Sequence, residues 1–300
     1  MAARYSRSRE AGIARMNGQF SIVIPARNEA QALRRIIPEL NERYPEAELI
    51  VVDDGSDDET AAVASAAGAT VIRHPYPMGN GAAVKAGARA ATGAALLFMD
   101  GDGQHAPGDA AKLCEALSRG FAMAIGGRDG RAHAGFWRCW ANRFYSALAS
   151  WITGRRIDDL TSGFRVVDAA KFREFIHILP NGFSYPTTIT MAFLRAGYPV
   201  TFVPVDVRQR EGKSHIRPLR DGIRFLLIIF RIGTFYSPLK IFFPACALLF
   251  LAGMGNYAYT YFTEGRFTNM SAMLLLASLF VFLIGLVAEQ ITALMYQRRT

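Results

Sequence analysis

The sequence predicts an α/β fold with a mostly parallel sheet, followed by a membrane-associated C-terminal segment. Short apolar runs alternate with helical stretches from Phe20 to Gly126, and two long uncharged runs lie near the C-terminus. With 300 residues, 51% of them hydrophobic, the chain can form one soluble domain and a markedly apolar addition. This composition excludes wholesale disorder, collagen and a disulfide-stabilised mini-protein.

Strands and helices alternate strictly in the N-terminal domain. Apolar runs predict five strands, at residues 21–25, 49–53, 70–73, 94–99 and 123–126. The stretches between them predict four helices, at residues 30–44, 60–67, 82–91 and 109–118. This alternation implies a parallel sheet with helices on both faces, and such sheets bind ligands at the carboxyl ends of their strands.

Polar clusters follow three of these strands. They are Pro25, Arg27, Asn28 and Glu29 after the first, Asp53 and Asp54 after the second, and Asp100, Asp102, Gln104 and His105 after the fourth. Because these strand ends meet at one edge of a parallel sheet, we expect the three clusters to form one site.

The Asp-Gly-Asp-Gly-Gln-His cluster predicts a divalent metal site. Asp100 and Asp102 are two residues apart beyond an apolar strand, and the glycines allow a tight turn around an ion. Oxygen ligands suit Mg²⁺ or Mn²⁺ bridging to phosphates, whereas the 12-residue calcium pattern is missing. The alternative is a solvated acidic turn, an interpretation that fits Asp57, Asp58 and Glu59 well as acids of a first helical turn.

The net charge of +9 is concentrated in two short stretches. Residues 1–15 contribute +3 and residues 208–240 contribute +6, whereas residues 16–207 sum to −1. A neutral body with cationic flanks argues against nucleic-acid binding and favours a membrane surface with anionic head groups. We expect residues 1–18 to be a disordered Arg-rich arm.

Two transmembrane helices are predicted, at about 241–262 and 269–290. The first uncharged run has 22 residues, which as a helix span about 33 Å against a hydrocarbon core of roughly 30 Å. The positive-inside rule applied to Arg231, Lys240, Arg298 and Arg299 predicts that the preceding domain and both termini are cytoplasmic, at the cell inner membrane. The alternative is a pair of buried core helices.

Two amphipathic helices are predicted near the membrane surface. Residues 217–236 place Arg217, Arg220, Arg224 and Arg231 on one helical face with apolar residues around the rest. Residues 136–152 carry an i, i+4 row of aromatic and leucine side chains, and the alternative is a surface helix packed on the core.

The sequence lacks the patterns that are typical of several other classes of site. Cys114, Cys139 and Cys246 are odd in number and unpatterned, so they indicate neither a disulfide framework nor a zinc site. No G-x-x-x-x-G-K-[ST] sequence is present, and the glycines around Asn80 lack dinucleotide-binding spacing, which disfavours ATP hydrolysis and hydride transfer.

Several motifs together resemble glycosyltransferase family 2, which has the GT-A fold. They are Ser-Ile-Val-Ile-Pro-Ala-Arg-Asn-Glu (21–29), Val-Val-Asp-Asp-Gly-Ser-Asp-Asp-Glu-Thr (51–60), Gly-Asn-Gly-Ala-Ala-Val-Lys (79–85) and Met-Asp-Gly-Asp-Gly-Gln-His-Ala-Pro (99–107). Asp-Leu-Thr-Ser-Gly-Phe-Arg (159–165) and Arg-Glu-Gly-Lys-Ser-His-Ile (210–216) more narrowly resemble the polyprenyl-phosphate glycosyltransferases, the dolichyl-phosphate mannosyltransferase group. The match covers residues 20–216, within a catalytic domain predicted at 19–216 and followed by a membrane segment at 237–300.

The resemblance implies inverting transfer of one sugar from a UDP- or GDP-sugar to a membrane polyprenyl phosphate. It implies donor contacts from Pro25, Arg27, Glu29, Val52, Asp54, Gly101, Asp102, Arg208, Arg210 and Lys213. It implies metal ligation by Asp100, Asp102 and Gln104. It implies acceptor-phosphate contacts from Arg128, Arg143, Ser146, Ser162 and Arg165. The predicted catalytic set is Asp102, Arg128, Arg165, Arg210 and Lys213. Some similar enzymes assemble through their membrane helices, so a homo-oligomer is compatible with the resemblance.

General chemistry supports the implied reaction independently of the family resemblance. A phosphate monoester is anionic at neutral pH, so it needs no general base to attack a sugar carbon. Positioning and neutralisation of the leaving group should therefore dominate catalysis. Arg side chains bind phosphate oxygens bidentately, although a single Arg taken alone is more often part of a surface ion pair.

The sequence departs from the family pattern at several positions. Arg27 stands where an aromatic residue is common, His215 replaces a lysine, and no Gln-x-x-Arg-Trp occurs, which disfavours a processive synthase. The alternatives are a nucleotide-sugar-binding scaffold without turnover, a transferase for another lipid acceptor, and a sugar-1-phosphate nucleotidyltransferase. The donor base and sugar stay open, and residues 181–190 receive no role.

Overall fold

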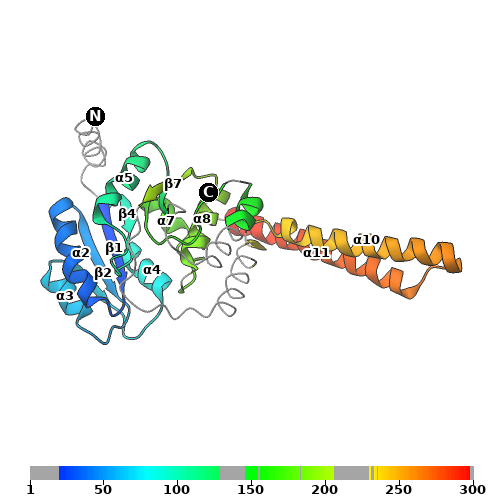
Figure 1. Cartoon of the computed structure of the whole chain (residues 1–300), viewed down its shortest axis with the longest axis horizontal. Helices are drawn as coiled ribbons and strands as arrows, with labels where there is room; N and C mark the ends of the chain where they lie inside the picture. Colours follow the sequence, from blue (N-terminus) through cyan, green and yellow to red (C-terminus); the bar gives the residue numbers. More distant parts are fainter. Residues whose placement is uncertain are drawn as a thin grey trace. The chain divides into compact units, whose positions relative to one another are not determined.

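The computed structural model describes residues 20–128, 146–154, 156–182, 184–205, 230, 233–234 and 236–297 (Figure 1). The chain divides into two units, Met1–Ser146 with Ile157–Ile216, and Ala147–Arg156 with Arg217–Thr300. The predicted arm at 1–18, the predicted helix at 217–236 apart from four residues, and residues 136–145 lie outside the described part. Residues 146–152, the end of the predicted helix at 136–152, are helical.

The first unit is built on a seven-stranded sheet with the order β3-β2-β1-β4-β6-β5-β7. Its strands are β1 (Phe20–Ala26), β2 (Glu48–Asp53), β3 (Thr70–Arg73), β4 (Ala95–Phe98), β5 (Met123–Arg128), β6 (Arg165–Asp168) and β7 (Val200–Val205). Its helices are α2 (Ala30–Arg43), α3 (Thr60–Ala66), α4 (Asn80–Ala90), the 3-10 turn η1 (Pro107–Asp109), α5 (Ala110–Ser118), α7 (Ala169–Glu174) and α8 (Tyr185–Arg195).

The five predicted strands and four predicted helices are confirmed to within two residues at each end. β6 is the exception to a wholly parallel sheet, because it pairs antiparallel with both β4 and β5. Its four residues begin with Arg165, and a charged residue rarely begins a buried strand, so hydrophobic patterning alone does not reveal it.

Helices cover both faces of the sheet, as the alternation predicts. The main core lies on the face covered by α2, α3 and α5, where Leu33, Ile37 and Leu113 pack with strand residues such as Ile22 and Leu97. On the other face a Cβ at Gly87 of α4 would lie 2.3 Å from Val23 Cγ1, so helix and strand touch there through a glycine. Figure 1 shows α4 on the opposite side of β1 and β2 from α2 and α3.

α7 is tied to the end of α4 by an arginine. Arg173 donates from Nε to Ala88 O at 3.0 Å and from Nη2 to Ala91 O at 2.5 Å. These carbonyls belong to the C-terminal turn of α4, where a cation also offsets the helix dipole.

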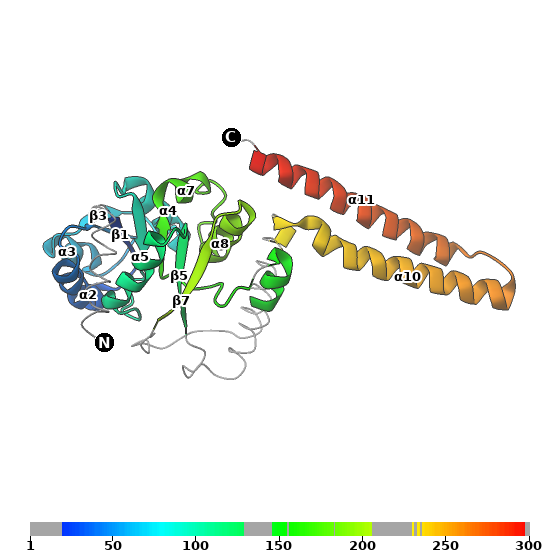
Figure 2. The same cartoon turned by 90° about the horizontal axis from the view of Figure 1, so that it is seen from above.

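The second unit contains the long helices α10 (Pro238–Glu264) and α11 (Asn269–Gln297), which pack as an antiparallel hairpin (Figure 2). Both are long and apolar enough to cross a membrane, and they include the predicted spans. Glu289 Oε2 accepts from the Leu239 amide at 3.2 Å, and Ser278 donates to Cys246 O at 3.0 Å, so polar bonds join the two helices. Gly265, with φ of +65°, ends α10.

Candidate functional site

The three polar clusters that the sequence singles out lie at the carboxyl ends of β1, β2 and β4, at one edge of the sheet. β1 pairs in parallel with β2 on one side and with β4 on the other. The chain passes from β1 through β2 and β3 before it crosses to β4, so the strand order reverses at β1. Open α/β sheets bind ligands at the carboxyl ends of strands at such a reversal.

The loop after β4, residues 99–105, which we call the acidic loop, is anchored on the end of β1. The Gly101 amide donates to Pro25 O at 3.3 Å. Asp102 Oδ1 accepts from the Gln104 amide at 3.1 Å, and Gly103 between them has a φ of +73°, which favours glycine. Asp100 and Asp102 are both half-buried.

The donor set of the acidic loop fits a divalent ion. Within the described residues, no three His, Cys, Asp or Glu side chains come together in a complete metal-binding group. The acidic loop supplies two carboxylates and the Gln104 amide, and Mg²⁺ sites commonly combine one or two carboxylates with water and substrate phosphates. These residues therefore fit a divalent ion whose remaining ligands would be water or phosphate oxygens.

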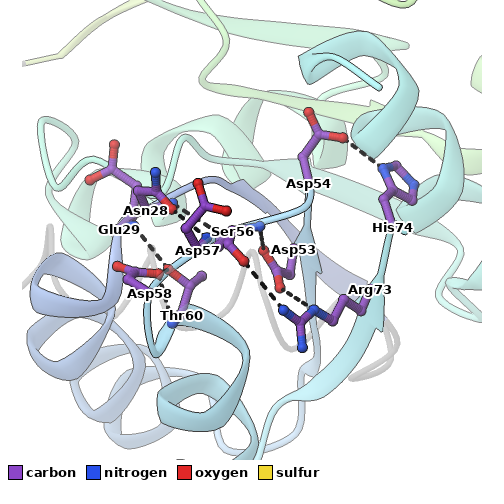
Figure 3. Close-up of polar contacts among 10 residues, drawn as sticks. All are labelled: Asn28, Glu29, Asp53, Asp54, Ser56, Asp57, Asp58, Thr60, Arg73 and His74. Atoms are coloured by element: carbon purple, nitrogen blue, oxygen red, sulfur yellow. Dashed lines mark hydrogen bonds and ion pairs between the residues drawn. The ribbon is translucent and has the colours of Figure 1, made fainter. Parts of the chain in front are cut away.

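Asp53 closes the turn after β2 (Figure 3). Its Oδ1 accepts from the Ser56 amide at 2.9 Å, and its Oδ2 lies 3.2 Å from Arg73 Nε in an ion pair. The Asp53 side chain is fully buried. Asp53 therefore stabilises the loop after β2.

Asp54 organises the segment that leads into α4. Its Oδ1 lies 2.7 Å from His74 Nδ1 and 2.8 Å from the Met78 amide, while its Oδ2 accepts from the Gly79 amide at 2.8 Å. Burial raises the pKa of Asp54, but these three hydrogen bonds outweigh it, and the pKa lies below its usual value. Asp54, predicted to contact the nucleoside, already has protein donors on both oxygens.

Side chains from Ser56 to Thr60, between β2 and the first turn of α3, cap the start of α2. Three amides at and just before the first residue of α2 are the donors: Asn28 N to Ser56 Oγ at 3.0 Å, Glu29 N to Thr60 Oγ1 at 3.0 Å, and Ala30 N to Asp58 Oδ2 at 3.3 Å. Asn28 has a φ of +56°, and its Oδ1 accepts from the Asp57 amide in return. Figure 3 shows the contacts of Asn28 and Glu29 with the segment after β2.

Thr60→Val tests this capping. Thr60 is fully buried, and valine keeps its shape but removes the Oγ1 that accepts from the Glu29 amide. We expect the free energy of unfolding to fall by about 1–2 kcal/mol, measured by chemical denaturation. Thr70→Val, at an exposed position on β3, is the control and should leave stability unchanged. Equal stability of the two variants would contradict the assignment.

The first turns of α4 hold the loop at 179–182. Lys85 Nζ donates to Leu179 O at 3.0 Å and to Asn181 Oδ1 at 2.5 Å. Asn181 O accepts from the Ala82 amide at 3.1 Å, and a Cβ on Gly81 would lie 2.1 Å from Pro180 O. Asn181, to which the sequence assigned no role, therefore joins the chain before α8 to α4.

Arg165 lies in the protein interior. Its side chain is fully buried, and it donates from Nη1 to Pro186 O and Thr190 Oγ1, both at 3.1 Å, and from Nη2 to Ser162 O. Its Cζ lies 5.8 Å from the centre of the Tyr185 ring. The Nη1 and Nη2 groups of Arg165 therefore bond to other parts of the same domain.

The remaining predicted residues are distributed as follows. Pro25 and Val52 are buried in their strands, Glu29 is half-buried, Arg27 is exposed beyond β1, and Ser146 and Ser162 are buried. Arg128 ends β5. The side chain of Arg128 and all of Arg143, Arg208, Arg210 and Lys213 lie outside the described residues.

Three buried polar residues of this region were not singled out from the sequence. They are Ser56, Thr60 and His74, each of which binds a group 20 or more residues away in the chain. Ser56 and Thr60 belong to the motif at 51–60, which is the signal that could have identified them. His74 directly follows β3 at the same sheet edge, which was its only sequence signal.

Comparison with known proteins finds two family matches. Residues 21–178 match "Glycosyl transferase family 2", and residues 237–294 match "GtrB C-terminal hairpin". The polyprenol monophosphomannose synthase of Mycolicibacterium smegmatis is 27% identical over 63% of this chain and 77% of its own length. The dolichyl-phosphate hexose transferase of Haloferax volcanii is 27% identical over 68% of this chain and 89% of its own length.

A solved structure supports the fold. Glucosyl-3-phosphoglycerate synthase from Mycobacterium tuberculosis, in complex with Mn²⁺ and UDP-glucose, has a TM-score of 0.58 and 24% identity over 74% of this chain and 81% of that chain. The same enzyme has been crystallised with Mg²⁺ and UDP. The family match covers the sheet from β1 through β6 with the acidic loop inside it, and on this basis the chain belongs to glycosyltransferase family 2.

Proposed function

We propose that this glycosyltransferase transfers one sugar from a nucleoside diphosphate sugar to a polyprenyl phosphate and so makes a lipid-linked sugar. The observation that carries the proposal is the combination, in one chain, of the acidic loop at the strand-order reversal and a C-terminal hairpin of two apolar helices. The names of the two relatives, a polyprenol monophosphomannose synthase and a dolichyl-phosphate hexose transferase, support this acceptor class.

The donor is assigned to the edge formed by β1, β2 and β4. Pro25, Glu29 and Asp54 are assigned to the nucleoside, and Asp100, Asp102 and Gln104 would hold Mg²⁺ or Mn²⁺ on the diphosphate. When bound, the ion would supply positive charge to the leaving group. Arg27, Val52, Gly101, Arg208, Arg210 and Lys213 complete the proposed donor site.

The acceptor phosphate is assigned to Arg128, Arg143, Ser146 and Ser162. Arg side chains bind phosphate oxygens in pairs and hold one oxygen in line with the anomeric carbon. That anionic oxygen forms a bond to the anomeric carbon while the bond from this carbon to the diphosphate oxygen breaks, so configuration inverts. The nucleoside diphosphate leaves with the bonding electrons, and no general base is required.

The proposal extends to location. Lys240 before the first span and Arg298 after the second are cationic flanks on the same side of a two-span hairpin. This distribution supports a catalytic domain and both termini in the cytoplasm, at the inner membrane. The polyprenyl phosphate would then meet the domain at the cytoplasmic surface.

A donor panel tests the proposal. Detergent-purified protein is incubated with undecaprenyl phosphate, Mn²⁺ or Mg²⁺, and labelled UDP- and GDP-sugars in turn. We expect one donor to give a labelled, acid-labile lipid, and EDTA to prevent its formation. Nucleotide binding without a lipid product from any donor would favour a binding scaffold and contradict the proposal.

A further inference from the structure

The segment 162–165, which we call the floor segment, lies beside the acidic loop. β6 runs antiparallel to β4 with Arg165 opposite Phe98, so continuation of this register brings Gly163 opposite Asp100. The structure agrees, because a Cβ built on Gly163 would lie 2.6 Å from Asp100 Oδ2 and 3.0 Å from Oδ1. The Asp100 carboxylate therefore packs directly on the Gly163 backbone, where no side chain fits.

The other end of the acidic loop also rests on the floor segment. The His105 ring stacks on the Phe164 ring with centroids 4.7 Å apart and an interplanar angle of 14°. Phe164 O accepts from the Gly126 amide at 2.9 Å, which fixes Phe164 to β5. The floor segment thus contacts the acidic loop on both sides of Asp102.

Arg165 fastens the floor segment to α8. Its Nη2 donates to Ser162 O, and its Nη1 donates to Pro186 O and Thr190 Oγ1 in the first turns of α8. A fully buried cation is costly unless it is hydrogen-bonded, so the acceptors of Nη1 and Nη2 hold this side chain in one geometry. Lysine lacks the planar guanidinium, which bonds Ser162 O and the two acceptors in α8 at the same time.

We infer that Arg165 is a positioning residue for the metal-binding carboxylates, acting through the floor segment. This role rests on the proposed function of the acidic loop and differs from the acceptor-phosphate contact that the family resemblance implies. Residues that orient metal ligands typically change metal affinity 10- to 100-fold when they are replaced. Arg165 should therefore govern the affinity for metal and nucleotide, and leave the affinity for polyprenyl phosphate unchanged.

The test uses full-length protein in detergent with Arg165→Met, Arg165→Lys and Gly163→Ala. Mn²⁺ binding in the presence of UDP or GDP is followed from the electron paramagnetic resonance signal of free Mn²⁺, which requires no turnover. We expect all three substitutions to weaken Mn²⁺ binding, by about 10- to 100-fold for Arg165→Met and Gly163→Ala. The KM for polyprenyl phosphate should stay within about twofold of the wild-type value.

Arg173→Met is the matched control, because Arg173 also donates to carbonyls but joins α7 to α4, away from the acidic loop. It should lower Tm and leave Mn²⁺ affinity unchanged. Gly163→Ala keeps Arg165 intact, so it still tests the inference if Arg165→Met does not fold.

The inference would be overturned by unchanged Mn²⁺ binding in the Arg165 and Gly163 variants. It would also be overturned by an acceptor KM raised about tenfold with normal Mn²⁺ binding. A wild-type protein that binds Mn²⁺ and makes no lipid product would instead contradict the proposed function.

Discussion

Asp102→Ala is expected to lower the rate of sugar transfer by about 10³-fold or more while the protein stays folded and membrane-bound. The substitution removes one of the two carboxylates that we propose hold the metal, and charge on the departing diphosphate would then lack its main stabilisation. Within the described residues, the Asp102 side chain accepts one hydrogen bond, from the Gln104 amide, and the residue is half-buried, so stability should change by only about 0.5 kcal/mol. Initial rates with saturating Mn²⁺, together with Tm, measure both effects.

Glu46→Ala is the control for this variant. Glu46 is exposed and precedes β2, at the amino end of the strand, whereas the proposed site lies at the carboxyl ends. It removes the same charge without touching the acidic loop, so its rate should match the wild type. Undiminished turnover by Asp102→Ala with Mn²⁺ present would show that Asp102 is not a ligand of the catalytic metal.

Gly81→Ala is expected to produce the largest loss of stability. The new Cβ would lie 2.1 Å from Pro180 O and 2.9 Å from Gly182 O, and both atoms are backbone, so the loop before α8 must move. Overpacking against backbone of this kind costs about 3 kcal/mol, or about 6–12 °C in Tm for a domain of this size. Thermal unfolding followed by circular dichroism measures the shift.

Gly182→Ala is the matched control in the same loop. A Cβ at Gly182 meets no atom within 4 Å, so its Tm should stay within about 2 °C of the wild-type value. If Gly81→Ala were as stable as Gly182→Ala, the loop at 179–182 would not be held against α4 as described. Lys85, which donates to two groups of that loop, would then have no structural role there.

The sheet and helices of the first unit could be predicted because their signals are local. β1, β2 and β4 are buried on both faces and therefore appear as continuous apolar runs. β6 has four residues and starts with a charged one, so its place between β4 and β5 depends on contacts distant in the sequence. α10 extends beyond its predicted apolar run to Glu264, where Gly265 ends it.

The position of the candidate site could be predicted from the strand ends, but the contacts of its residues could not. Asp54 follows β2 as expected, yet its partner His74 lies 20 residues further along the chain. Arg165 belongs to a motif that resembles a phosphate-binding segment, and its burial depends on Pro186 and Thr190 of α8. Periodicity and motif spacing carry no information about such pairs, because folding alone brings the partners together.

The most direct test of the central claim, transfer of a sugar to polyprenyl phosphate, uses a donor labelled twice. The nucleoside diphosphate sugar carries ¹⁴C in the sugar and ³²P in the phosphate attached to it, and the lipid product is extracted after a single incubation with undecaprenyl phosphate. Because the proposed reaction breaks the bond between the anomeric carbon and the diphosphate oxygen, we expect ¹⁴C alone in the lipid and ³²P in the released nucleoside diphosphate. If both labels appeared in the lipid, the protein would transfer sugar phosphate. If neither label appeared there, it would transfer nothing. Either result would contradict the proposed reaction.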